Sequence, residues 1–353
     1  MSKTISIASL SALLLLASNT PAPAQVCGDT IGPNETVTLT ADIGPCTDSV
    51  SAALTIIGPA KVDLNGHQIQ CDSTSPSNGV DVLGSGAYVS GGSIRGCDAY
   101  SLRVGGTGKH SVTSIAIKGG VDSGKGVEVL TGSDLNRLTD IVVTNSGTGF
   151  HIFGNKGKLS GLTASSSDDE GIILEGSSNK VTRMTAVNST KEGIIVNGSN
   201  NKIQDCEAVT SGNGGIVLNG ANNSLKDCSA IRGLGDGFEV NGAGNSISAA
   251  ESDNNGQRGY DIFGDATRLS DSTAVNNGGD GVLLQEAAST VTGVRSIGNG
   301  GNGIQVDAGN VHSISRSVAL ESGGTHDIRD NTNCAGATWN DNTFRSANDP
   351  CIQ

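Results

Sequence analysis

Three ionisable side chains of different type occupy equivalent places in successive short segments. Arg103, Glu128 and His151 each lie between two apolar residues, as in Leu102-Arg103-Val104. An arginine could neutralise a uronate carboxylate, and a histidine beside an acid could abstract a proton from carbon. We therefore expect a catalytic group of the lyase or epimerase kind, with Tyr100, Lys125 and Phe153 beside it as substrate-binding residues. The alternative is an ordinary exposed strand face whose charges pair with one another.

A second group of acids follows in the run Asp168-Asp169-Glu170, and Glu192 lies 22 residues beyond Glu170. Two carboxylates could serve as the acid and base of glycoside hydrolysis, with Asp168 and Asp169 as the second choice for catalytic residues. The same oxygens could instead bind Ca²⁺, and the third alternative is that they are solvated turn acids. No cofactor is certain from the sequence, and the identity of any metal ligand is unknown.

The elements that must position these residues form a repeat. The motif Gly-apolar-variable-aliphatic runs from Gly126 to Gly303, with a first interval of 23 residues and seven intervals of 22. Segments starting at Gly79 and Ser101 extend the series upstream, and Thr325-His-Asp-Ile328 extends it downstream, which gives twelve rungs. Because the two apolar columns alternate with period two, they face a common interior on one side of a strand.

Composition agrees with a solenoid built from such rungs. Of 353 residues 52 are glycine, and aromatic residues make up only 3%. Asn and Gly, as in Asn197-Gly198 and Asn219-Gly220, recur between the apolar columns and tolerate the backbone of sharp corners. We therefore predict an all-β fold, a right-handed single-stranded parallel β-helix of about 12 coils of about 22 residues, capped at both ends.

The N-terminus and the cysteines predict a location outside the cytoplasm. Residues 1–24 have the positive start, apolar stretch and small final residues of a signal peptide, so we expect a secreted, periplasmic or cell-surface protein without membrane insertion. Spacing suggests four disulfides among the eight cysteines, although other connectivities stay open. The suggested pairs are Cys27–Cys46, Cys71–Cys97, Cys206–Cys228 and Cys334–Cys351. We expect a clipped cap over 25–60, the β-helix over 61–329 and a second clipped cap over 330–353.

Several segments resemble a known family. The run Val62-Asp-Leu-Asn-Gly-His67 before Gln68-Ile69, the later Gly91-Gly-Ser-Ile-Arg95 and the ending Asn340-Asp-Asn-Thr-Phe344 are similar to exported right-handed parallel β-helix repeat proteins of the pectate-lyase-like superfamily. The resemblance implies the fold and matches no enzyme subfamily. The motifs of polygalacturonases, mannuronan epimerases and pectate lyases are missing.

The negative charge of the chain narrows the classes of molecule that it is expected to bind. The formal net charge of −13 argues against nucleic acid as a partner, and we expect a monomer or weak self-association. We predict that the protein binds or processes a polysaccharide along an outer strand face, as a lyase, epimerase or hydrolase. The alternative is a non-catalytic surface or matrix protein, and the sequence leaves open whether the chain is an enzyme.

Overall fold

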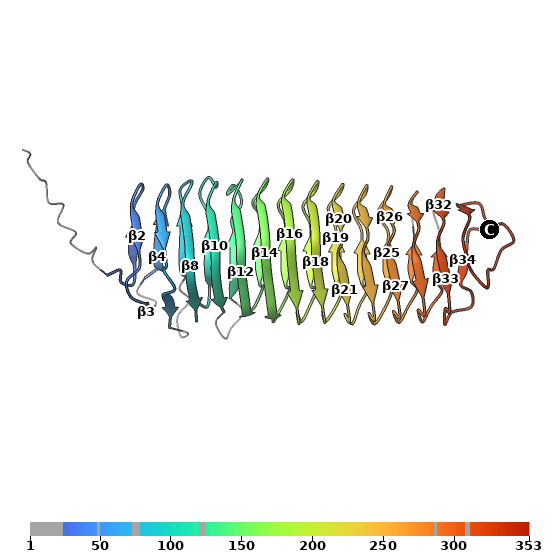
Figure 1. The fold of residues 1–353 in the computed structure, drawn as a ribbon, viewed down its shortest axis with the longest axis horizontal. Coiled ribbons are helices and arrows are strands. Elements are labelled where there is room, and N and C mark those ends of the chain that lie inside the picture. Colours follow the sequence, from blue (N-terminus) through green and yellow to red (C-terminus); the bar gives the residue numbers. More distant parts are fainter. Residues whose placement is uncertain are drawn as a thin grey trace, which may run out of the picture.

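The structure is a computed structural model that describes residues 24–47, 50–72, 78–119, 124–285, 288–307 and 311–352. The predicted signal peptide lies outside the described residues except for Ala24. All regular elements in the described part are strands, which stack in chain order along one axis to make a rod (Figure 1). No described segment forms a helix that could span a membrane.

One sheet, here sheet A, contains fourteen parallel strands and forms one face of the rod. Its strands, in order, are β1 (Asp29–Ile31), β4 (Ala52–Ile57), β7 (Asn78–Leu83), β9 (Tyr100–Val104), β11 (Lys125–Val129), β13 (Phe150–Ile152), β15 (Ile172–Leu174), β17 (Ile194–Val196), β19 (Ile216–Leu218), β22 (Phe238–Val240), β25 (Tyr260–Ile262), β28 (Val282–Leu284), β31 (Ile304–Val306) and β34 (Ile328–Asp330).

The remaining strands form sheet B, which closes the other sides of each coil. They are β2 (Thr36–Thr38), β3 (Ile43–Cys46), β5 (Lys61–Asp63), β6 (Gln68–Cys71), β8 (Tyr88–Arg95), β10 (Ser111–Lys118), β12 (Arg137–Ser146), β14 (Lys158–Ser167), β16 (Lys180–Val187), β18 (Lys202–Val209), β20 (Ser224–Lys226), β21 (Ser229–Ile231), β23 (Ser246–Ser248), β24 (Glu251–Asp253), β26 (Arg268–Ser270), β27 (Thr273–Val275), β29 (Thr290–Thr292), β30 (Arg295–Ile297), β32 (His312–Ser315), β33 (Val318–Leu320) and β35 (Ala337–Asn340). The long strand β18 pairs with both β20 and β21, because a corner separates the two halves of that side.

The core follows the predicted columns. In sheet A, Val127 pairs with Phe150 and Val129 pairs with Ile152, and all four side chains are buried. The glycine before each strand has a packing reason: a Cβ on Gly126 would lie 2.2 Å from Val143 Cγ1 and 2.6 Å from the Gly149 carbonyl oxygen. The predicted all-β parallel solenoid is therefore confirmed, with sheet A beginning two strands before the first predicted rung.

The ends differ in part from the expectation. The segment predicted as the N-terminal cap contains strands of both sheets, since β1 pairs with β4 and β2 pairs with β5. At the other end, Ile304 pairs with Ile328, 24 residues later, so Ile328 lies in the first apolar column and not in the second. The predicted register of the twelfth rung is wrong, because the second inward position there is Asp330, a fully buried acid that accepts a hydrogen bond from Trp339 Nε1 at 3.0 Å.

Four disulfides clip the described chain, and they join the cysteines in the pairs that spacing suggests. Cys206 and Cys228 are both buried and stand 22 residues apart on adjacent coils, with a Cα–Cα distance of 4.4 Å. The pairs Cys27–Cys46 and Cys334–Cys351 lie at the two ends of the rod.

Candidate functional site

Sheet A brings the three predicted catalytic residues together. Arg103 pairs with Glu128, and Glu128 pairs with His151, on the neighbouring strands β9, β11 and β13. The same column includes Asp81 on β7 before Arg103 and Ile173 on β15 after His151. The repeat therefore places all three side chains on one outer face, as the sequence predicts, while a catalytic role for them stays a prediction.

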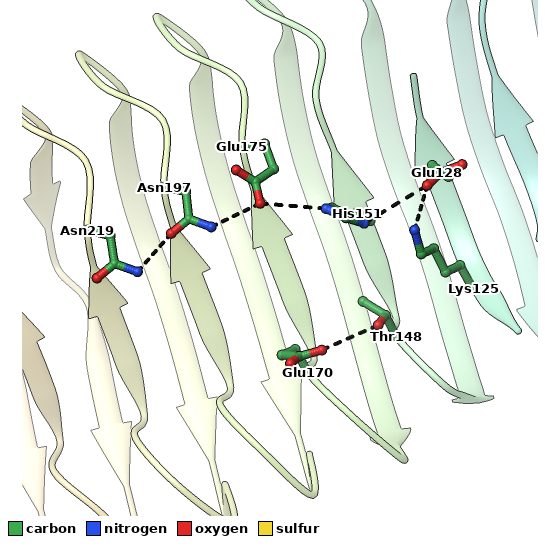
Figure 2. A network of polar contacts seen from close by, with 8 residues as sticks. All are labelled: Lys125, Glu128, Thr148, His151, Glu170, Glu175, Asn197 and Asn219. Atoms are coloured by element: carbon green, nitrogen blue, oxygen red, sulfur yellow. Dashed lines mark hydrogen bonds and ion pairs between the residues drawn. The ribbon is translucent and has the colours of Figure 1, made fainter. Parts of the chain in front are cut away.

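Each charged member of this column already has a partner on the protein. Arg103 Nε donates to Asp81 Oδ1 at 3.0 Å, and its Nη2 pairs with Asp81 Oδ2. Lys125 Nζ lies 2.6 Å from Glu128 Oε1 (Figure 2). Both cations also approach the Tyr100 ring, Arg103 Cζ at 5.9 Å and Lys125 Nζ at 5.7 Å from its centroid. Tyr100 and Lys125, predicted to bind substrate, thus contact the column itself.

His151 lies between two acids. Its Nδ1 is 4.0 Å from Glu128 Oε1 and its Nε2 is 3.7 Å from Glu175 Oε1, so neither nitrogen makes a hydrogen bond (Figure 2). Both nitrogens are buried, and the Phe153 ring packs at 4.3 Å between centroids. Burial lowers the pKa of His151, with the Lys125 charge adding to the effect and the two glutamates opposing it. A neutral imidazole with covered nitrogens cannot reach a substrate without movement of its neighbours.

The polar contacts continue along the rod beyond His151. Asn197 Nδ2 donates to Glu175 Oε1 at 2.9 Å, and Asn219 Nδ2 donates to Asn197 Oδ1 at 2.8 Å (Figure 2). The turn at residues 106–110 could form one side of a groove over this face. It instead packs into the coil, because His110 is buried and its Nε2 lies 2.9 Å from the Gly105 carbonyl oxygen. The opposite turn includes residues 120–123, which lie outside the described residues.

The second predicted acid group lies at the turn before sheet A. Lys191 Nζ is 2.9 Å from Asp169 Oδ1 and 3.4 Å from Glu170 Oε1, and these acids raise the pKa of Lys191. Glu170 also accepts a hydrogen bond from Thr148 Oγ1 at 3.5 Å (Figure 2). A lysine therefore balances Asp169 and Glu170, and the structure does not bring Asp168 or Asp169 into the Arg103–His151 column.

A site that the sequence analysis did not predict lies two coils beyond Glu170 along the same edge. The residue just before each leading glycine forms a stacked column, because the strands that follow pair in register. Successive members are Thr148, Glu170, Glu192, Gly214, Asp236, Arg258, Asp280 and Asn302. Gly214 alone carries no side chain, so a gap separates Glu192 from Asp236.

The gap forms an open hollow of about 260 Å³ in the surface. Its lining includes the carboxylates Glu192, Asp236 and Glu239 and the apolar side chain Leu234, which is 71% exposed. The remaining lining residues are Gly212, Asn213, Gly214, Gly235 and Gln257. A small polar hollow with one apolar edge suits a ring-sized ligand bearing hydroxyl groups.

Two of the carboxylates have different surroundings. The Asp236 side chain is only 11% exposed, and burial raises its pKa, although its Oδ1 accepts a hydrogen bond from the Arg258 backbone N–H at 2.7 Å. Across the gap, Glu192 Oε1 accepts a hydrogen bond from Asn213 Nδ2 at 3.3 Å in an exposed contact. Arg258 Nη1, 4.0 Å from Asp236 Oδ2, opposes the effect of burial on the pKa of Asp236. A more buried acid thus faces a more accessible one, and acid–base catalysis uses carboxylates in such different surroundings.

Comparison with known proteins identifies the fold. Residues 148–293, which run from just before β13 through β29, match the family described as "Right handed beta helix region". This stretch is similar to right-handed β-helix proteins, in agreement with the parallel coils of the structure. No curated protein matches its sequence.

Several solved structures are similar to this chain at low identity. One is the A-module of mannuronan C-5 epimerase AlgE4 from Azotobacter vinelandii, at 11% identity, TM-score 0.48, and 92% and 89% coverage of this chain and that chain. Another is the catalytic unit of the GH87 alpha-1,3-glucanase from Streptomyces thermodiastaticus, at 13% identity, TM-score 0.46, and 93% and 65% coverage. These likenesses concern the fold alone.

Metal binding has little support in the described part of the β-helix. The one group of three ligand-type residues within reach of each other there is Asp330, Cys334 and Cys351. Both cysteines are joined in a disulfide, so they cannot act as thiolate ligands. The Ca²⁺ site considered at Asp168 and Asp169 stays a prediction without a third described ligand-type side chain in place.

The sequence does contain a signal for the hollow. Acids precede the leading glycines of four of the regular rungs, and Gly214 interrupts that column. Reading only the outward position within each strand, as for Arg103 and His151, overlooks this column at the turn.

Proposed function

We propose that the β-helix hydrolyses a glycosidic bond of a polysaccharide bound in the hollow at Gly214. The observation that supports this is the gap in the acid column, which leaves Glu192 and Asp236 facing one space. Asp236 is suited to protonate the leaving oxygen, because burial raises its pKa. Glu192 is suited to activate a water molecule from the other side of the gap.

The spacing of the coils suggests the stereochemistry. Glu192 and Asp236 are two coils apart, which corresponds to roughly 9.6 Å between backbone positions. Carboxyl groups separated by about 6.5–9.5 Å leave room for the water of an inverting hydrolase, whereas retaining enzymes hold them at about 5–5.5 Å. We therefore propose hydrolysis with inversion at the anomeric carbon.

Charge favours a neutral or amino polysaccharide as the substrate. Three carboxylates line the hollow and the whole chain carries a net charge of −13, so a polyuronate would be repelled there. The amide groups of Asn213 and Gln257 can hydrogen-bond sugar hydroxyls, and Leu234 offers an apolar edge to a sugar ring. We place this activity outside the cytoplasm, in keeping with the predicted signal peptide and the four disulfides.

The test is a panel of neutral and amino polysaccharides assayed for new reducing ends. We expect wild-type protein to release reducing ends from at least one of them, and Asp236→Asn to lose at least about 100-fold in kcat. Asp265→Asn is the matched control, because it makes the same chemical change at an exposed residue outside the hollow. The proposal is wrong if no polysaccharide in the panel is cleaved, if Asp236→Asn retains full activity, or if the products carry unsaturated ends.

Binding without catalysis is the second candidate function. It is favoured by the column from Asp81 to Asn219, where the charges pair with one another and the His151 nitrogens are buried. Under this alternative a polysaccharide from the same panel would be retained by the protein and recovered at its original length.

A further inference from the structure

A row of positive charge runs along the outer face of sheet B. Arg137, Lys158, Lys180 and Lys202 are the first residues of β12, β14, β16 and β18. They pair in register, Arg137 with Lys158, Lys158 with Lys180, and Lys180 with Lys202. All four are exposed, and we call them the cation ladder.

Such a row needs an explanation, because like charges directly opposite one another on neighbouring strands are destabilising. Among the described residues, none of the four forms an ion pair with an acid of the protein. The acids at the next corner include Asp140, which pairs with Arg183 at 3.5 Å, and Asp227, which pairs with Lys226 at 3.8 Å. Four adjacent unpaired cations are also unexpected on a chain with a net charge of −13.

The ladder borders a trough. One hollow of about 310 Å³ is lined by Arg137, Lys158 and Lys180, and another of about 210 Å³ by Lys180, Lys202 and Lys226. The two share Lys180 and Thr182, so they follow one another along the rod. Beside the cations runs a column of hydroxyl and amide side chains, Thr139, Ser160, Thr182 and Gln204.

We propose that the cation ladder binds a linear anionic polysaccharide that carries one carboxylate on each sugar. Its cations repeat about every 4.8 Å and span roughly 14 Å, so one extended chain can meet several of them in succession. The neighbouring hydroxyl and amide groups can hydrogen-bond the sugar hydroxyls between the carboxylates.

The surroundings favour a polysaccharide over a nucleic acid. No aromatic side chain lines either hollow, whereas proteins that bind single strands stack bases on aromatic rings. The overall negative charge would also repel the denser charge of a nucleic acid. This surface is separate from the acidic hollow at Gly214, so the proposal does not depend on the proposed hydrolysis.

The experiment measures binding of the full mature chain to polygalacturonate by titration calorimetry at two salt concentrations. Fully methyl-esterified polygalacturonate is the matched ligand without charge, and single-stranded DNA is the competing class of polyanion. We expect binding to polygalacturonate that weakens as salt rises, and no binding to the ester. The double substitution Lys158→Gln with Lys180→Gln should weaken binding about tenfold or more.

Arg268→Gln is the matched control variant. Arg268 is exposed and has the same place in its coil, but Ser224 and Ser246 separate it from the ladder. Equal binding of the ester, an unchanged affinity of the double variant, or tighter binding of DNA than of polygalacturonate would each overturn the proposal. If the double variant fails to fold, Arg137→Gln with Lys202→Gln tests the two ends of the same ladder.

Discussion

Substitution of Gly214 can fill the hollow without destabilising the fold, so it tests the role of the hollow separately from folding. Its backbone lies outside the left-handed region, and the only close approach of an added Cβ would be to Val217 Cγ2, at 3.2 Å, which a shift of a few tenths of an ångström relieves. The other nearby atoms are the Asp236 carbonyl oxygen at 3.8 Å and Glu192 Cγ at 4.0 Å. A side chain at this position can therefore enter the hollow along the path that Glu192 follows one coil earlier.

The expected magnitudes follow from this geometry. Replacement of glycine by alanine at a compatible backbone position stabilises a protein by about 0.4–1 kcal/mol, so Gly214→Ala should raise the melting temperature by about 1–3 °C. Gly214→Gln should be at least as stable as wild type while its side chain occupies the space between the two acids. We expect kcat/KM to fall at least about 100-fold, which corresponds to about 2.7 kcal/mol.

The assay compares wild type, Gly214→Ala and Gly214→Gln for reducing-end release and for thermal unfolding by circular dichroism. Gly212→Ala is the contrasting variant, since its Cβ would lie 1.9 Å from the Thr190 carbonyl oxygen and should lower the melting temperature. Undiminished hydrolysis by Gly214→Gln would show that the hollow is not the active site. A loss of stability in Gly214→Ala would refute the claim that the position has free space.

Three further predictions concern stability. Replacing Cys206 and Cys228 together by alanine should cost about 3 kcal/mol, as expected for a closed loop of 22 residues, and denaturant unfolding under non-reducing conditions measures it. Asp280→Asn should equal or exceed the wild type in free energy of unfolding at pH 7, because burial raises the pKa of Asp280 and disfavours its ionised form in the fold. The difference in free energy of unfolding between variant and wild type should shrink as the pH falls towards 3.8, the ordinary pKa of an aspartate, and a difference that grows on acidification would contradict this. Tyr260→Phe should cost about 1 kcal/mol, since the phenol donates to the Thr273 carbonyl oxygen at 3.1 Å inside the core, and an unchanged melting temperature would argue against that bond.

Much of the fold could be predicted because one physical requirement repeats in every coil. Two inward aliphatic positions separated by one residue, as in Val127 and Val129, identify a strand of sheet A wherever the 22-residue register holds. Asp330 departs from this pattern, because it is an acid at an inward position, where it accepts hydrogen bonds from Trp339 and Thr332. Because the predicted pattern requires an aliphatic residue at each inward position, it excludes Asp330. The predicted register of the last rung is therefore wrong by two residues.

The candidate site was harder to predict, because its chemistry depends on what neighbouring coils supply. The sequence correctly stacks Arg103, Glu128 and His151, but it does not reveal that Asp81 and Lys125 pair with two of them. The sequence also does not single out Gly214, because a glycine creates a hollow only where the side chains on the two neighbouring coils, here Glu192 and Asp236, enclose the space that it leaves.

The constant register also makes each coil a unit of length. Ser246 and Arg268 are equivalent positions 22 residues apart, so excision of residues 246–267 would join two matching corners and shorten the rod by about 4.8 Å. That coil lies beyond the cation ladder and removes only Gln257 from the lining of the hollow. The length of the rod can thus be changed in steps of one coil, and the number of coils sets the distance between its binding surfaces and the ends of the rod.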